Sequence, residues 1–218
     1  MTEVKYVPME ATLLRVDGFD LDVANAARVS FDKYAEVLTD AEVRLIDYLA
    51  RHNHWTPFGH VGAQFRIKAP IFIARQLGKH QVGLVWNEVS RRYVASTPEF
   101  WKPDFWRGKP VNAKQGSDGP LGKDAQVVWG SHYSQLMTRA MELYSYMVES
   151  GVAPEQARSV LPQSAMTEWI WTGSLAAWAR VCKLRLDEHT QFENTEVAKK
   201  IDTLMKQAFP VSWSALMK

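Results

Sequence analysis

The sequence predicts an α+β fold in which helices predominate and a few strands form a small sheet. Helical periodicity covers most of the chain, and strand-like alternation occurs only in short stretches. The two patterns do not alternate regularly, as they would in a protein built from βαβ units. The chain has 218 residues, 46% hydrophobic and 23% charged, which suits a globular protein of one well-packed domain or two small ones.

The first predicted elements are a helix over residues 40–52 and a strand over residues 60–68. Thr39 and Glu42 match a capping box, in which each side chain accepts a hydrogen bond from a backbone N–H at the helix start. The apolar stripe of this helix consists of Leu45, Ile46 and Leu49. In the strand, apolar and polar side chains alternate, which is typical of a half-buried strand.

A short helix is expected directly after this strand, over residues 71–77. Pro70 suits the first turn of a helix, and Gly78 is a natural stop. Arg75 and Lys79 are four positions apart, so they would share a face if the last turn extends that far.

The C-terminal half is expected to be mostly helical. Residues 102–124 are rich in Pro, Gly, Lys and Asp and indicate a long surface loop, which in a compact domain is often functional or mobile. A long helix that Gly151 ends should follow. The remaining predicted elements are this helix over residues 126–149, a short helix from Pro154, a strand over 165–172, and helices over 174–186 and about 195–208.

Composition restricts the class of protein. A single cysteine, Cys182, rules out an intrachain disulfide and favours a cytoplasmic location, in the host cytoplasm for a viral protein. Residues 1–5 lack a signal-peptide pattern, and no apolar run approaches the ~18 residues that span a bilayer. The net charge of +2 does not favour a general nucleic-acid binder. Nine tryptophans favour a large interface or a planar ligand.

A polar cluster occupies residues 74–81 and 87–93. It combines cations, amides, a histidine, a carboxylate and a tyrosine, which suits an anionic ligand that contains a ring. Neither GxGxxG nor GxxxxGK[ST] occurs, so side chains would have to hold a phosphate, and arginine suits bidentate contacts. For each cation the alternative is solvated surface charge. The available cations are Arg75, Lys79, Arg91, Arg92, Arg158 and Arg185.

No metal motif or protein nucleophile is recognisable. The three histidines in residues 52–60 lack an HExxH or CxxC context, so no metal is expected. Ser30 and Ser90 lack the GxSxG elbow. Cys182 falls on the apolar side of its helix, where a cysteine is usually a packing residue. An enzyme with this sequence would take its chemistry from a cofactor.

Six blocks resemble the flavin-dependent thymidylate synthases, in that family's order. These blocks are Arg28-Val29-Ser30-Phe31, residues 54–60 (HWTPFGH), residues 68–75 (KAPIFIAR), the signature residues 74–76 (ARQ) with 87–93 (NEVSRRY), residues 157–162 (ARSVLP) and residues 184–193 (LRLDEHTQFE).

Two features depart from the family pattern. The family's Arg-His-Arg triplet reads Lys79-His80-Gln81, and eight residues separate Gln81 from Ser90, one more than in the signature. Gly59 stands where the HxTPFEH block has a glutamate. Gln81 therefore lacks the fixed charge and the bidentate donor of an arginine.

The resemblance implies one domain over residues 1–218, with the fold of the thymidylate synthase-complementing proteins: a small, mostly antiparallel sheet packed with several helices. It implies a flavoprotein methyltransferase of dTMP biosynthesis that reductively methylates dUMP to dTMP. FAD would be the cofactor, with NADPH as reductant and methylenetetrahydrofolate as one-carbon donor. The resemblance also implies a homotetramer with shared active sites and no nucleic-acid or membrane partner.

Carried over by position, Arg185 is the expected catalytic residue. It resembles the arginine that contacts the pyrimidine and favours its N3-deprotonated form, and a fixed cation stabilises charge that develops on a ring. The residues implied for dUMP are Gln76, Gly78, Lys79, Glu88, Ser90, Arg91, Arg92, Arg158 and Arg185. Those implied for FAD are Ser30, His54, Thr56, Lys79, His80, Gln81, Glu88, Ser174, Arg180 and His189.

Two alternatives stay open. An enzyme with the same fold could act on a different pyrimidine nucleotide or give a different one-carbon outcome, because residues 59 and 79–81 depart from the family pattern. A non-enzymatic nucleic-acid-binding module would combine basic side chains with aromatic stacking groups. Its residues would be Arg75, Lys79, Arg91 and Arg92 with Trp86 and Tyr93.

Overall fold

The computed structural model describes residues 3–111 and 116–218, and the chain forms two compact units. Unit 1 comprises Met1–Glu10, Lys68–Leu77 and Glu88–Trp169. Unit 2 comprises Ala11–Ile67, Gly78–Asn87 and Ile170–Lys218. Among the described helices, none is both long and apolar enough to cross a membrane.

Four strands of the described chain form one antiparallel sheet, in the order β1-β2-β4-β3. The strands are β1 (Glu10–Asp17), β2 (Gly62–Pro70), β3 (Leu84–Glu88) and β4 (Met166–Ser174). The sheet and the helices around it confirm the α+β class. The predictions of β2 and β4 are confirmed within two residues at each end, whereas β1 and β3 were not predicted.

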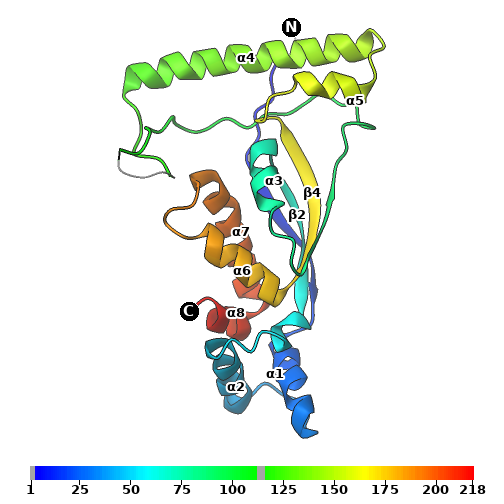
Figure 1. Cartoon of the computed structure of the whole chain (residues 1–218), viewed down its shortest axis with the longest axis vertical. Coiled ribbons are helices and arrows are strands. Elements are labelled where there is room, and N and C mark those ends of the chain that lie inside the picture. Colours follow the sequence, from blue (N-terminus) through cyan, green and yellow to red (C-terminus); the bar gives the residue numbers. More distant parts are fainter. Residues whose placement is uncertain (1–2, 112–115) are drawn as a thin grey trace. The chain divides into compact units, whose positions relative to one another are not determined.

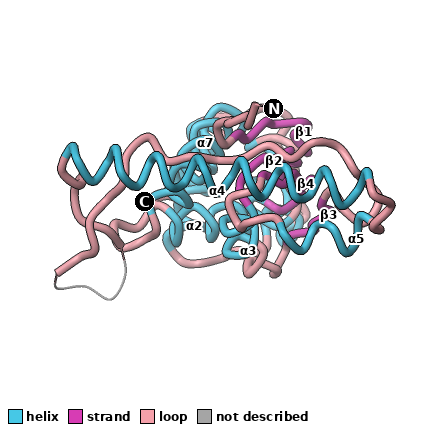
Figure 2. Tube along the Cα trace, turned by 90° about the horizontal axis from the view of Figure 1, so that it is seen from above, coloured by secondary structure: helices cyan, strands magenta, loops and turns pink. Residues whose placement is uncertain are grey.

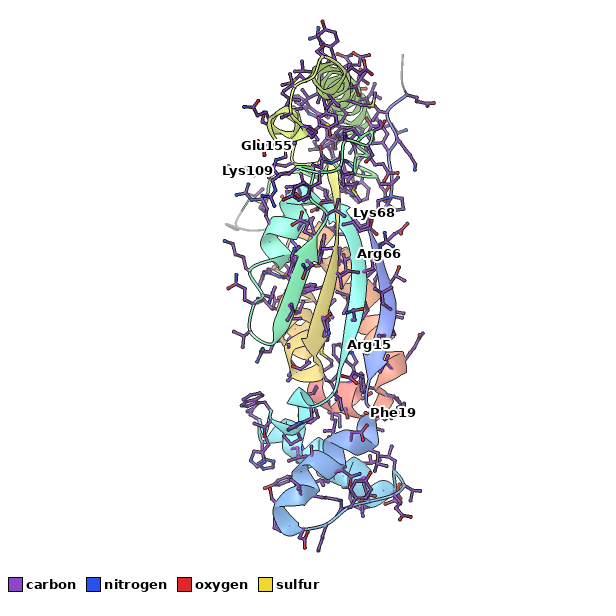
Figure 3. All side chains as sticks on the ribbon, turned by 90° about the vertical axis from the view of Figure 1, so that its right-hand side faces the viewer. Arg15, Phe19, Arg66, Lys68, Lys109 and Glu155 are labelled. Atoms are coloured by element: carbon purple, nitrogen blue, oxygen red, sulfur yellow. The ribbon has the colours of Figure 1, made fainter. Side chains whose placement is uncertain are left out.

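Strand β2 has one buried face, as its alternating sequence predicts. Ala63, Phe65 and Ile67 are buried, whereas Arg66 is exposed. Arg66 extends from the sheet in Figure 3. On the polar face, the Gln64 amide donates a hydrogen bond of 2.9 Å to the Thr172 hydroxyl of β4. The buried face of this strand is the one that unit 2 covers with a helix.

In unit 2, α6 (Leu175–Arg185) covers that face through an aromatic core. The Trp178 indole donates a hydrogen bond of 3.1 Å to the Ala63 carbonyl, and its ring lies 4.8 Å from the Phe65 ring. Trp171 packs edge-on against Trp178 at 4.9 Å and against Trp86 at 5.3 Å. Edge-to-face aromatic packing of this kind fixes both the separation and the orientation of the strands and α6.

The other helices of unit 2 are α1 (Asp20–Arg28), α2 (Asp40–Arg51), α7 (Phe192–Ala208) and α8 (Pro210–Leu216), with the short 3₁₀ helices η1 (Val29–Phe31) and η2 (Pro57–Gly59). Helices α1, α2 and α8 pack together (Figure 1). The predicted capping box is present: Thr39 caps α2, and Glu42 accepts the Thr39 N–H at 3.0 Å. Helix α7 begins three residues before its predicted start.

Unit 1 contains α3 (Ile71–Leu77), α4 (Lys123–Glu149) and α5 (Pro154–Ala157), with η3 (Arg158–Val160). Helix α5 lies beside α4 (Figure 2). A hydrophobic core of this unit consists of the buried residues Phe100, Met137, Met141 and Ala165. The partly buried side chains that pack against it are Val4, Tyr6, Ile71, Tyr133 and Leu161. Helix α3 has its predicted bounds but ends at Leu77, so Lys79 lies beyond its last turn and does not share a helical face with Arg75.

The predicted loop over residues 102–124 has neither helix nor strand in its described part before Lys123. Residues 112–115 lie outside the described residues. Gln126 of α4 fixes the loop, because its amide oxygen accepts the Trp106 N–H at 2.7 Å and its amide nitrogen donates to the Trp106 carbonyl at 2.8 Å. The first turn of α4 therefore organises the segment that precedes it.

Candidate functional site

Three groups of predicted site residues form in the structure: one in unit 1 and two in unit 2. The first is a cavity of about 650 Å³ in unit 1, which we call the arginine pocket. Predicted nucleotide residues from distant parts of the chain meet in it. Its charged lining residues are Lys5, Lys68, Glu88, Arg91, Glu99, Arg158 and Glu168.

Two lysines of the arginine pocket share one carboxylate. The Glu99 carboxylate accepts a hydrogen bond of 2.5 Å from Lys5 and also pairs with Lys68. These two hydrogen bonds, from Lys5 and then from Lys68, lower the pKa of Glu99. The three side chains together carry one net positive charge. Sequence analysis did not predict this group, although Lys68 belongs to one of the family-like blocks.

The two arginines of the pocket retain donors for a ligand. Arg91 donates a hydrogen bond of 2.9 Å to the Ser96 carbonyl, and its guanidinium lies over the Tyr144 ring. Arg158 donates through Nε to the Glu155 carbonyl at 3.2 Å. A guanidinium has five N–H donors, so each of these contacts leaves several available. A pocket with two such groups suits a phosphate.

Ser90 and Arg92, also predicted for the nucleotide, form a separate contact in unit 1. The Ser90 hydroxyl accepts hydrogen bonds from the backbone N–H and the Nε of Arg92, at 3.4 and 3.2 Å. The Arg92 guanidinium lies over the Tyr93 ring, 5.0 Å from its centre. Glu88, predicted for both ligands, lines the arginine pocket and accepts the Thr167 hydroxyl at 2.6 Å.

The second group lines a cavity of about 960 Å³ in unit 2, which we call the aromatic pocket. It brings together Ser30, His54 and Thr56, three residues predicted for FAD. Its further members with rings or charges are Arg28, Phe31, Lys33, Tyr48 and Trp55. The volume lies at the upper end of the range of about 300–1,000 Å³ that is typical of small-molecule sites.

The lining of the aromatic pocket is held by contacts around α2. The Tyr48 ring packs against the His52 ring at 4.1 Å and against the edge of His54 at 6.0 Å. Arg28 pairs with Glu42, and hydrogen bonds, chiefly those from Thr39, lower the pKa of Glu42 to about 2. Arg28 is therefore neutralised within the protein, which leaves Lys33 as the cation most available to a ligand.

The third group joins His80 to α6 in unit 2. Arg185 donates through Nε to His80 Nε2 at 3.0 Å, and Arg180 donates to the Val82 carbonyl at 2.7 Å. Because Nε2 accepts, the neutral imidazole carries its proton on Nδ1. Burial lowers the pKa of His80 first, and the nearby cations Arg185 and Arg180 lower it further. Burial also lowers the pKa of Arg185.

Gly83 allows the turn after His80 to approach α6. Its φ is +75°, which side chains other than glycine rarely adopt. A Cβ at this position would also lie only 3.1 Å from the Ala177 Cβ. Ser174 completes this region as the N-cap of α6, because its hydroxyl accepts the Ala177 N–H at 3.3 Å.

The remaining predicted site residues lie outside these groups. Lys79, Gln81 and His189 are exposed. Besides Ser90, Arg92, Ser174 and Arg180, whose contacts are given above, five predicted residues line neither of the two described pockets and are not part of the His80–Arg185 pair: Gln76, Gly78, Lys79, Gln81 and His189. Within residues 3–111 and 116–218, no group of three or more metal-binding side chains is placed to hold a metal ion.

Cys182 is a packing residue, as predicted. It is fully buried on α6, and burial raises the pKa of its thiol far above the ordinary range. A thiol that stays protonated is a poor nucleophile. Cys182 is therefore not a candidate nucleophile.

Sequence comparisons match this chain to one family of proteins. Residues 12–211 match the family described as thymidylate synthase complementing protein. A flavin-dependent thymidylate synthase of Thermus thermophilus is 36% identical over 198 residues, which cover 91% of this chain and 72% of that protein. That of Thermosipho africanus is 35% identical over 210 residues, covering 94% of this chain and 90% of that protein.

A solved structure is similar over nearly the whole chain. It is that of the UMP/dUMP methylase PolB from Streptomyces cacaoi bound with 5-Br UMP. The TM-score is 0.88 at 28% sequence identity, and the match covers 98% of this chain and 96% of that one. The same methylase bound with 5-Br dUMP matches with a TM-score of 0.84.

Proposed function

Since the chain belongs to the thymidylate synthase complementing proteins, the flavin-dependent thymidylate synthases, we propose that it reductively methylates dUMP to dTMP. Methylenetetrahydrofolate would supply the one-carbon unit, NADPH the reducing equivalents, and FAD would be the bound cofactor. We also propose that residues 1–218 act as one catalytic domain within a homotetramer. The observation that carries the proposal is the arginine pocket, which gathers predicted nucleotide residues from separate blocks of the sequence.

The arginine pocket would bind the nucleotide phosphate. Arg91 and Arg158 each keep guanidinium donors beyond their contacts with backbone carbonyls. The planar fork of arginine pairs with two phosphate oxygens at once, which fixes both position and orientation. Ser90 would assist indirectly, because its hydroxyl already orients the Arg92 side chain.

Arg185 would act on the pyrimidine ring. Its guanidinium is partly buried and is oriented by the hydrogen bond to His80. A cation that is already desolvated and oriented stabilises developing negative charge more strongly than one that water must rearrange around. Contact with the ring would therefore favour the N3-deprotonated form.

The residues of the aromatic pocket fit a flavin. Exposed rings of Phe31, Tyr48 and Trp55 provide surfaces for a planar ring system, and Ser30 and Thr56 provide hydroxyls for hydrogen bonds. Lys33 provides a cation for a phosphate. When bound, a flavin supplies two-electron redox chemistry, which no side chain of this protein can provide. The protein would bind and orient the cofactor and exclude water from it.

Exposed apolar side chains support the proposed oligomer. On α4, Trp129, Leu136, Leu143 and Tyr146 are exposed although large and apolar. Such side chains gathered on one element of a water-soluble protein mark contact surfaces. We infer that this helix contacts another subunit of the tetramer.

A product assay tests the proposed function. Purified protein is incubated with FAD, NADPH, dUMP and methylenetetrahydrofolate labelled in the transferred carbon, and labelled dTMP is separated by chromatography. Product should form in the complete mixture and should disappear when dUMP, NADPH or methylenetetrahydrofolate is omitted, or when flavin has been removed from the protein. Absence of labelled dTMP from the complete mixture, with flavin bound, would refute the proposal.

UMP is a second candidate substrate, since the structurally similar methylase is named for both UMP and dUMP. The two nucleotides differ only in the 2′-hydroxyl, so the same phosphate and ring contacts serve both. Parallel assays with UMP and dUMP would compare their kcat/KM values. We expect a higher kcat/KM for dUMP. A higher kcat/KM for UMP would instead identify the protein as a UMP methylase.

A further inference from the structure

Trp55 of the aromatic pocket lies beside Gly59. Trp55 lines the pocket with 62% of its surface exposed. The position that a Cβ of residue 59 would occupy lies 3.6 Å from Cζ3 and 3.9 Å from Cε3 of the indole. The six-membered ring of the indole therefore lies beside Gly59, the position at which the family's HxTPFEH pattern has a glutamate.

This contact limits what residue 59 can be. Both separations are ordinary van der Waals distances, so a single methyl group fits beside the indole. A longer side chain would have to turn away from the ring or displace it. The indole of Trp55 therefore has room beside the glycine at position 59, and a glutamate there would crowd it.

The surroundings of Trp55 indicate a ligand that is both planar and polar. Phe31 and Tyr48 line the same pocket with exposed rings. Ser30, Thr56 and Lys33 line it with hydroxyls and a cation. A surface that only contacts another subunit would not need a concave site of about 960 Å³ that combines these groups. A flavin has both the ring system and the phosphates that this lining would bind.

We propose that Trp55 is a flavin-stacking residue whose indole packs against the isoalloxazine ring, and that Gly59 keeps the space the indole occupies. The identity of the ligand rests on the proposed function, whereas the pairing of residues 55 and 59 rests on the contact itself. Aromatic surfaces stack favourably in offset or edge-on arrangements.

Flavin binding and flavin fluorescence test the proposal without any turnover. Full-length apoprotein is titrated with FAD, and the emission of the bound flavin is measured at saturation. An indole stacked on isoalloxazine quenches its emission by electron transfer. Trp55→Ala should bind FAD about 10-fold more weakly and should raise the emission of the bound flavin. Trp55→Phe should keep much of the affinity but also lose quenching.

Variants at residue 59 test the pairing. Gly59→Ala should bind FAD as the wild type does, because its Cβ fits. Gly59→Glu should show the weaker binding and the brighter flavin of Trp55→Ala. The double variant Trp55→Ala/Gly59→Glu should be no worse than either single variant, since both remove the same contact. Phe19→Ala, which removes a 73% exposed aromatic side chain that lines neither described pocket, is the control and should change neither quantity.

Each result supports or overturns the proposal. Unchanged affinity and emission in Trp55→Ala, with an unchanged thermal midpoint, would overturn it. FMN lacks the adenine ring, so a loss seen with FAD but absent with FMN would place the adenine against Trp55 and overturn the assignment to isoalloxazine. Wild-type protein that binds no flavin overturns both this inference and the proposed function. Wild-type protein that binds flavin with quenching but forms no dTMP refutes only the function.

Discussion

Arg185 combines the properties that a ring-contacting cation needs. It is partly buried, and its Nε is fixed by a hydrogen bond of 3.0 Å to His80. The contact uses one of its five N–H donors and leaves the others for a substrate. Among the predicted site residues, Arg185 is thus placed for electrostatic stabilisation, and its removal should affect turnover more than folding.

Substitution of Arg185 tests this role. Arg185→Ala should lower kcat about 10²–10³-fold, the usual effect of removing one preorganised electrostatic group. Arg185→Lys keeps the charge but loses the planar fork, so it should recover only part of the activity. Steady-state rates of dTMP formation give the comparison, with thermal unfolding as the check on folding. Near-normal turnover in the alanine variant would exclude the assigned role.

His80 makes this pair sensitive to pH. Burial and the cations Arg185 and Arg180 lower its pKa. The imidazole is therefore protonated less readily in the folded protein than in the unfolded chain. Between the unfolded pKa of about 6.5 and the lower folded pKa, the unfolded state binds more protons. The stability that neutral His80 contributes is therefore fully present above about pH 6.5 and is lost as the pH falls through the folded value.

Urea unfolding at pH 7.5 and pH 5.5 measures this effect. The free energy of unfolding of the wild type should fall more over this interval than that of His80→Gln, which does not titrate. The acid limb of the pH profile of kcat should also differ between the wild type and His80→Gln, because protonation of His80 removes the acceptor of the Arg185 hydrogen bond. Equal falls in both proteins would show that His80 does not titrate in this range.

At the scale of elements, helix α8 depends on a single carboxylate of α1. Asp20 is 6% exposed and accepts the backbone N–H groups of Val211 at 3.0 Å and Ser212 at 2.8 Å. These donors belong to the first turn of α8, where a helix has no partners of its own. Asp20 therefore caps α8 from another helix and links α1 to the C-terminal end of the chain.

Loss of this cap should destabilise unit 2. Asp20→Ala leaves two donors near or in the core without partners, and the free energy of unfolding should fall by about 2 kcal/mol. Asp20→Asn keeps one acceptor oxygen and should lose less. Urea denaturation measures both, with Asp17→Asn, an exposed position in β1, as the control. A fall in Asp20→Ala no larger than in the control would contradict the capping role.

Sequence patterns predicted the elements that have a clear buried face. Strand β2 and helix α2 alternate apolar and polar residues with the period of their structures, and α3 lies between Pro70 and Gly78. Strand β1 has no fully buried residue, and β3 is a short edge strand, so neither shows a strong pattern. Helix α1 was missed because one of its buried residues is Asp20, whose burial depends on a distant partner.

The candidate site could be predicted only where family-like blocks supplied the residues. Ser30, His54 and Thr56 meet in the aromatic pocket, as the resemblance implies. The contact of Trp55 with Gly59 could not be predicted, because it depends on the path of the chain through η2. Lys5, which shares the Glu99 carboxylate, precedes all six blocks, and the sequence offered no signal for its role.

At the scale of the whole molecule, the arginine pocket with Arg158 belongs to unit 1, whereas Arg185 belongs to unit 2. If the proposed homotetramer builds each active site from several subunits, the nucleotide's phosphate and its ring are held by arginines of different chains. Closed oligomers commonly form sites at such interfaces, because symmetry repeats every contact. The two arginines can then be removed from different chains of one tetramer, and a chain that lacks one of them can be complemented by a neighbouring chain that retains it.

Mixing two inactive variants tests this arrangement. Arg158→Ala and Arg185→Ala homotetramers should each be nearly inactive. After dissociation and reassembly of an equal mixture, a site that takes Arg158 from one chain and Arg185 from another is intact in about one quarter of random combinations. About a quarter of wild-type dTMP formation should therefore return, while each variant reassembled alone stays inactive. If activity does not return although mass spectrometry detects mixed tetramers, both arginines come from the same chain.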